Sequence, residues 1–153
     1  MYDKVITLLL GLYYLYRKSP KMKKGLQISF KSLNRNRVLP TRVGGTRWLP
    51  HLARAISNFE KGYKAIRNHL ETASHENSKA EGLAKIAADG NVLVFMMSLK
   101  VVITPLMKLS LGLQREGLTL ADACLTLSLS KSALSLLRNE LWQRRHCHIN
   151  QPF

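Results

Sequence analysis

The residues best suited to chemistry are Arg47 and Trp48, a planar cation beside a planar aromatic ring. They follow Gly44-Gly45, a glycine pair that lets the backbone turn sharply and approach another surface closely. Thr46 and Pro50 indicate that a helix begins here, because a hydroxyl can cap unpaired N–H groups and proline is tolerated in the first turn. We therefore expect both side chains at a helix entrance, where they can be presented to a ligand.

The chain is strongly basic, and its positive charge is concentrated near the start. It contains 24 Lys and Arg residues against 9 Asp and Glu residues, for a formal net charge of +15. No acidic residue lies between Asp3 and Glu60, and residues 1–54 carry a net charge of +11. This balance favours a polyanionic partner, either nucleic acid or an anionic membrane face. The plain alternative is that these lysines only form a solvated surface.

Basic and aromatic side chains in this region could form a nucleic-acid interface. Arg47, Arg54 and Lys61 repeat every seven residues, so a helix would place them on one face, beside the apolar stripe that begins at Trp48. The alternative for Trp48 is core packing at the end of that stripe. The residues predicted to contact nucleic acid are Arg42, Arg47, Trp48, Arg54, Lys61, Lys21, Lys23 and Lys24.

The residue pattern gives no support for catalysis or for metal binding. Hydrolytic and phosphoryl-transfer sites need carboxylates, metals or an activated nucleophile in one pocket, whereas the nine acidic residues are scattered. Gly44-Gly45 lacks the Lys-Ser/Thr of a phosphate-binding loop, and Cys124 and Cys147 form no Cys-x-x-Cys pair. Three neighbouring side chains, His146, Cys147 and His148, cannot easily surround one ion without further ligands. We expect no catalytic residue, no metal, no cofactor and no small-molecule substrate.

Helical periodicity is found throughout the chain, and no stretch shows sustained strand alternation. Ser19-Pro20 predicts a capped helix start, so a second helix is expected there. The fifth helix is apolar on most sides, which predicts that it is central to the core. The expected helices cover residues 3–17, 20–33, 50–73, 80–88, 91–113 and 119–138. Apolar residues of the third helix recur at steps of three or four: Trp48, Leu52, Ala55, Phe59, Tyr63, Ile66 and Leu70. The predicted fold is an all-α bundle of five or six helices.

Two apolar stretches raise the alternative of a membrane segment. Val5–Tyr16 has 12 residues, whereas a spanning helix needs about 20. Val92–Leu113 is long enough, but it carries Lys100 and Lys108 with Pro105 between them. We expect both stretches to be core helices, with no membrane partner.

Three ordered segments of the chain resemble the hAT superfamily of transposases and the zinc-finger proteins derived from them. The first is Gly11–Lys21, the second is Pro40–His51, which contains Gly-Gly-Thr-Arg-Trp, and the third is Leu109–Leu120. The resemblance covers roughly residues 5–136. It implies a truncated piece of such a protein, namely the helical insertion of a ribonuclease-H-like transposase domain, here residues 1–138. Residues 139–153 do not resemble the family, and we expect them to form a disordered tail.

The resemblance also implies a function. Arg47-Trp48 matches the family's Arg-Trp motif, which implies that Trp48 stacks on an unpaired base and that Arg47 contacts a phosphate. The family's catalytic Asp-Asp-Glu residues lie outside the matched region, so we expect a nuclear, non-enzymatic protein that binds DNA with low specificity. Two alternatives stay open. The first is a structural or protein-interaction module, which could form homo-oligomers, and the second is a membrane-associated protein anchored by Val5–Tyr16.

Overall fold

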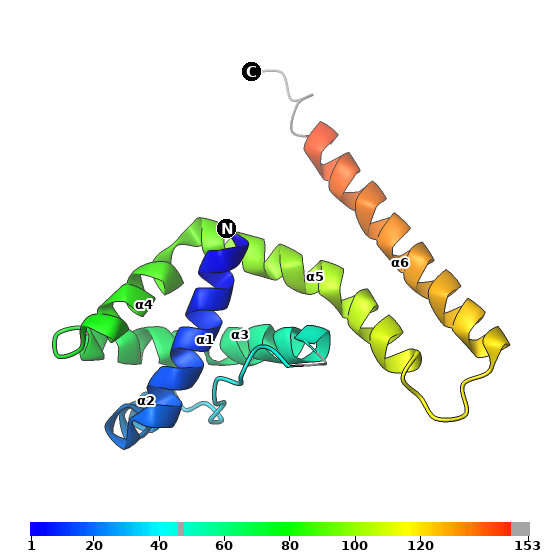
Figure 1. Ribbon diagram of the computed structural model, residues 1–153. Helices are drawn as coiled ribbons and strands as arrows, with labels where there is room; N and C mark the ends of the chain where they lie inside the picture. Colours follow the sequence, from blue (N-terminus) through cyan, green and yellow to red (C-terminus); the bar gives the residue numbers. More distant parts are fainter. Residues whose placement is uncertain (46–47, 148–153) are drawn as a thin grey trace. The chain divides into compact units, whose positions relative to one another are not determined.

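The computed structural model (Figure 1) describes residues 1–45 and 48–147, of which residues 140–147 are described by their backbone alone. The regular structure of these residues is entirely helical. The helices are α1 (Tyr2–Lys18), α2 (Pro20–Ser32), α3 (Trp48–Ala73), α4 (Ser78–Ala88), α5 (Gly90–Gly112) and α6 (Leu120–Cys147). The predicted all-α fold class is thereby confirmed.

The helices belong to two compact units, Met1–Lys100 and a second unit that begins at Val101. The sequence favours one helical domain over residues 1–138, whereas the division of the structure falls inside α5. It lies one turn before Pro105, whose ring removes the intrahelical hydrogen bond that the Val101 carbonyl would otherwise accept. The sixth helix runs to Cys147 instead of ending near residue 138.

Side-chain caps explain where several helices begin. The Ser19 hydroxyl accepts a hydrogen bond from the Met22 N–H at 3.3 Å, as Ser19-Pro20 predicts. The carboxamide oxygen of Asn77 accepts from two N–H groups at the start of α4, at 2.9 and 3.3 Å. At α5 the cap is Asp89, whose carboxylate accepts from the Asn91 N–H at 3.0 Å. Thr119 and Asp122 cap α6 reciprocally.

The core of the first unit is built around α3. Phe59, Ile66 and Leu70 of the predicted stripe are at most 1% exposed. Around them pack buried residues of α1, α2, α4 and the first turns of α5, including Val5, Leu8, Leu12, Leu26, Phe30, Ala80, Ala87, Val92 and Met96. The apolar run Val5–Tyr16 is therefore a core helix, as predicted.

From α2 to Leu39 in the loop after it, the chain runs antiparallel to α3. Near the end of α3, a Cβ atom added at Gly25 would lie 2.3 Å from Nε2 of His69, so α2 and α3 approach closely there. A Cβ atom at Gly62, in the middle of α3, would lie 3.1 Å from the ring of Phe30. In the loop after α2, the carbonyl of Leu39 accepts a hydrogen bond from the Asn58 side chain at 3.3 Å. The start of α2 therefore lies beside the C-terminal end of α3, far from the residue at which α3 begins.

The second unit buries few side chains. Ile103 and Ser130 are buried, whereas leucines of α6 such as Leu120 (82% exposed) and Leu129 (63% exposed) are not. In α5, Val94, Val101 and Val102 are also exposed. The expectation that the fifth helix forms the centre of the core is therefore wrong, because only its first turns pack into the core of the first unit.

Two stretches, Gly90–Gly112 and Leu120–Asn139, have the length and apolar composition to cross a membrane. In α5, however, Val92 and Met96 are fully buried against the first unit. Lys100 of the same helix forms an ion pair with Glu60 of α3. A charged side chain near the centre of a spanning helix costs about 2.5–3.5 kcal/mol. The first turns of α5 therefore fit a protein core better than lipid.

Candidate nucleic-acid interface

Trp48 is the first residue of α3, and its side chain is 51% exposed. Before it, Gly44 and Gly45 have φ angles of 109° and 105°, a region that only glycine enters easily. The backbone at this glycine pair therefore has the conformation that glycine permits, and Trp48 is half exposed. Arg47 and Thr46 lie outside the described residues.

Arg54 and Lys61 are exposed on α3, seven residues apart and thus on one face of the helix. Arg54 follows Trp48 by six residues, which at 3.6 residues per turn places it about 120° around the helix from the ring. The prediction that these cations lie beside the stripe led by Trp48 is therefore wrong. They are presented to solvent on the outer face of α3, away from the core.

The lysines of α2 lie far from Trp48. Lys21 pairs with Glu76, in the turn after α3, at 2.5 Å. Trp48 precedes His69, the residue of α3 that faces α2 at this end, by 21 residues, or about 32 Å at 1.5 Å per residue. The predicted interface is therefore two separate groups, with Lys21, Lys23 and Lys24 near one end of α3 and Trp48 at the other.

Most of the predicted cations lack a carboxylate neighbour. Within the described residues, the ones that are exposed and take part in no ion pair are Lys23, Lys24, Arg42, Arg54 and Lys61. The first unit as a whole has 18 basic and 6 acidic residues, for a net charge of +12. Positive charge is thus left uncompensated on this unit.

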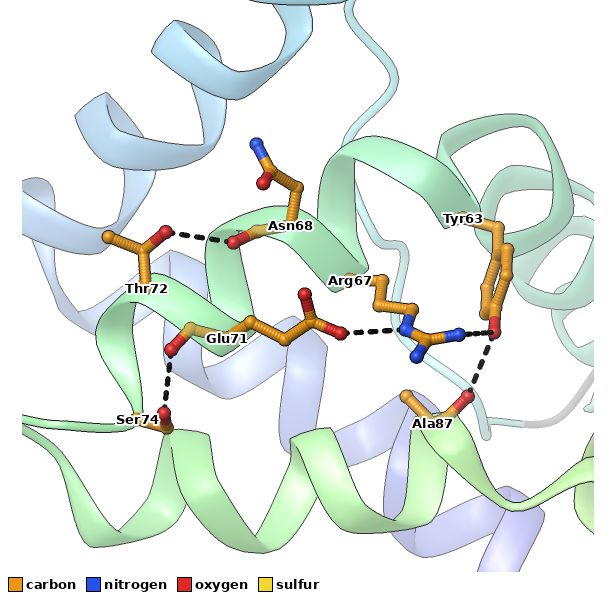
Figure 2. Close-up of polar contacts among 7 residues, drawn as sticks. All are labelled: Tyr63, Arg67, Asn68, Glu71, Thr72, Ser74 and Ala87. Carbon is orange, nitrogen blue, oxygen red and sulfur yellow. Dashed lines mark hydrogen bonds and ion pairs between the residues drawn. The ribbon is translucent and has the colours of Figure 1, made fainter.

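Unlike these cations, Arg67 of α3 has hydrogen-bond partners on its own helix (Figure 2). Its Nε donates to Glu71 at 2.8 Å, and its Nη1 donates to the hydroxyl of Tyr63 at 3.4 Å. The Tyr63 hydroxyl in turn donates to the carbonyl of Ala87 in α4 at 3.3 Å. Hydrogen bonds to Glu71 and Tyr63 raise the pKa of Arg67. This arginine helps to join α3 to α4 through Tyr63.

A buried polar pair, Tyr16 and His69, was not anticipated from the sequence. The Tyr16 hydroxyl lies 3.1 Å from Nδ1 of His69, and the two residues are 3% and 7% exposed. Burial raises the pKa of Tyr16 and lowers the pKa of His69, so both side chains are neutral at neutral pH. One sequence signal was available, because His69 lies three residues after Ile66 and thus near the buried stripe.

The described residues hold no group of three or more His, Cys, Asp or Glu side chains that could share a metal ion. The side chains of His146, Cys147 and His148 lie outside the described part of the chain. Comparison of the chain with protein-family models, with curated proteins and with solved structures gives no match.

Proposed function

We propose that the chain is a non-catalytic helical module that binds DNA with low sequence specificity through its basic first unit. In this proposal it derives from the helical insertion of a hAT-superfamily transposase and acts in the nucleus. The three sequence segments that resemble that superfamily support the origin, and the charge of the first unit supports the partner.

The observation that carries the proposal is the set of uncompensated cations on the first unit. Arg54 and Lys61 project from the outer face of α3, and Lys23 and Lys24 project from α2. A cation without a carboxylate partner keeps its full charge for a phosphate, whereas an internally paired one must first give up its neighbour. Phosphate contacts fix a protein on the duplex but do not read sequence, which is why low specificity is expected.

Trp48 adds a second mode of contact. Its indole is half exposed at the start of α3, and a base that is not paired offers a flat face to such a ring. The turn at Gly44 and Gly45 allows the chain to approach a strand closely at this point. In the proposal, the cations bind the backbone of DNA and Trp48 favours sites where a base is unpaired.

Binding of labelled duplex DNA, followed by fluorescence anisotropy over a series of salt concentrations, tests the proposal. Each phosphate neutralised contributes about −0.9 to the slope of log affinity against log salt. Five contacting cations would give a slope of about −4.5. A slope near zero, or no binding at 50 mM salt, would contradict the proposal.

The exposed leucines of α6 favour a second candidate, a protein-interaction module. Leu120, Leu125, Leu129 and Leu136 are each at least 60% exposed. Exposed apolar side chains in such number mark association surfaces in many proteins. This candidate predicts concentration-dependent homo-oligomers that persist at high salt, which sedimentation velocity at 1 M salt would detect.

A further inference from the structure

A cavity of about 710 Å³ opens between α2 and the last turns of α3, entirely within the first unit. Pockets that bind small ligands have volumes of about 300–1,000 Å³. Its wall includes Lys21, Met22, Lys24 and Ile28 from α2, together with Asn68 and His69 from α3. Trp48 and the α3 cations Arg54 and Lys61 do not line it.

Gly25 shapes the wall of this cavity by leaving room for His69. A Cβ atom at position 25 would lie 2.3 Å from Nε2 and 2.7 Å from Cδ2 of the imidazole, so any side chain there would displace the ring. Both residues line the cavity. The edge of the imidazole that carries Nε2 is therefore the edge turned toward α2.

Tyr16 holds the ring of His69 in the wall of the cavity. The buried phenol oxygen lies 3.1 Å from Nδ1 of His69, and the two groups share a hydrogen bond whose direction depends on the imidazole tautomer. Nε2 lies against Gly25, where a Cβ atom would come within 2.3 Å of it. The imidazole therefore gives the cavity a flat wall in a fixed position.

The mouth of the cavity is positively charged. Lys24 takes part in no ion pair within the described residues, while Lys21 is bound to Glu76, which also lines the cavity. The hydrogen bond from Lys21 lowers the pKa of Glu76, so this carboxylate stays ionised. An anionic ligand would therefore meet Lys24 directly and compete with Glu76 for Lys21.

The remaining wall is apolar. Met22 is 8% exposed, and Ile28 is 59% exposed, so an apolar side chain of α2 is open to solvent beside the cavity. The thioether of methionine makes favourable contacts with aromatic rings. The cavity thus suits an occupant with a flat apolar body and a negative charge.

We propose that this cavity binds a nucleotide, either free or as an unpaired nucleotide of a strand, with the base against Met22, Ile28 and His69 and the phosphate on Lys24. This inference goes beyond DNA binding by the exposed cations, since the cavity lies at the opposite end of α3 from Trp48. A free nucleotide can occupy it whether or not the chain binds duplex DNA.

The test is calorimetric titration of the full chain with AMP and with a single-stranded deoxythymidine octamer. The variant Lys24→Gln removes the charge at the mouth, and Lys31→Gln is its matched control, because Lys31 is an exposed lysine of the same helix that does not line the cavity. Saturable binding should weaken at least fivefold in Lys24→Gln and change less than twofold in Lys31→Gln. Ile28→Asp, at an exposed position, should weaken it likewise.

The probes distinguish the source of the nucleotide. Binding of AMP supports a free ligand, and binding of the octamer but not of its abasic counterpart supports a nucleotide within a strand. Binding of neither probe, or binding that Lys24→Gln and Lys31→Gln affect equally, would overturn the inference. Salt-dependent duplex binding that depends on Arg54 and Lys61 would survive that result, so the two proposals fail separately.

Discussion

At the scale of single residues, Tyr16 and His69 show how one glycine and one phenol fix a histidine. Gly25 leaves space for the imidazole edge, and the Tyr16 hydroxyl engages Nδ1 at 3.1 Å. Burial then favours the neutral ring, which lowers the pKa of His69. The pKa of His69 therefore differs between the folded and the unfolded state.

The stability of the first unit should therefore depend on pH through His69. Its folded-state pKa lies below the unfolded value of about 6.5, so between those two values the unfolded chain binds more protons. The free energy of unfolding should fall as the pH is lowered from 7.5 to 5.5, and His69→Gln should flatten this profile. Urea titrations monitored by circular dichroism measure it. His75→Gln, in the exposed turn after α3, is the control, and equal profiles for both variants would refute the prediction.

Trp48 carries a prediction about selectivity. Base stacking on an aromatic ring contributes about 1–3 kcal/mol, so Trp48→Ala should weaken binding to DNA with an unpaired base by about 5- to 150-fold. Binding to a fully paired duplex should be unchanged, because the cations contact only the backbone. Competition between bulged and paired duplexes measures the ratio. Tyr14→Ala removes another exposed aromatic ring of the first unit, and it should leave the ratio as it is.

At the scale of the helix, α3 organises the first unit, and its core face should dominate stability. Ile66 is fully buried, whereas Leu129 of α6 is 63% exposed. Ile66→Ala should lower the free energy of unfolding by about 2–5 kcal/mol, because it removes methyl groups and leaves a cavity. Leu129→Ala should change it by less than about 0.5 kcal/mol. Similar losses in the two variants, measured by urea denaturation, would show that the core is not where the structure places it.

The start of α4 offers a milder test of a single element. Asn77 accepts two hydrogen bonds from the N–H groups of Lys79 and Ala80, so Asn77→Ala should cost about 1 kcal/mol. Ser78→Ala alters the next residue, whose side chain is exposed, and should be close to neutral. Thermal melts of the two variants compare them directly.

Local patterns allowed the helices to be predicted, because capping and periodicity act over a few residues. Ser19-Pro20 and Thr119–Asp122 mark helix starts that the structure confirms, and the buried stripe of α3 follows from its spacing. Contacts between distant residues could not be predicted in this way. Tyr16 and His69 are 53 positions apart, and Lys21 and Glu76 are 55 apart.

The candidate site was predicted as a set of residues but not as an arrangement. Arg54 and Lys61 were expected on one face of a helix, and the structure agrees. Their angle to Trp48 follows from 3.6 residues per turn alone, so the spacing already contained it. The distance from Trp48 to the lysines of α2 depends on how the helices pack, which the sequence does not give. The cavity beside His69 has no sequence motif at all, since it arises from the approach of α2 to α3.

At the scale of the whole molecule, the two units differ in how much they bury, and their dynamics should differ accordingly. Amides open locally where few apolar contacts hold a helix. Among the described residues of α6 only Ser130 is buried, whereas each of the helices α1–α4 has several buried residues. Hydrogen exchange followed by mass spectrometry should show faster exchange in α6 than in α1–α4. Equal protection in dilute solution would contradict this.

The most direct test of DNA binding compares two double variants that remove the same charge from the first unit. Arg54→Ala with Lys61→Ala removes two cations that lack ion-pair partners, and Lys4→Ala with Lys85→Ala removes two that pair with Asp89 and Glu81. Anisotropy over a salt series should show the slope of log affinity against log salt become less steep by about 1.8 in the first variant and stay as in the parent in the second. If the two variants change the slope equally, or neither changes it, the outer face of α3 does not bind DNA.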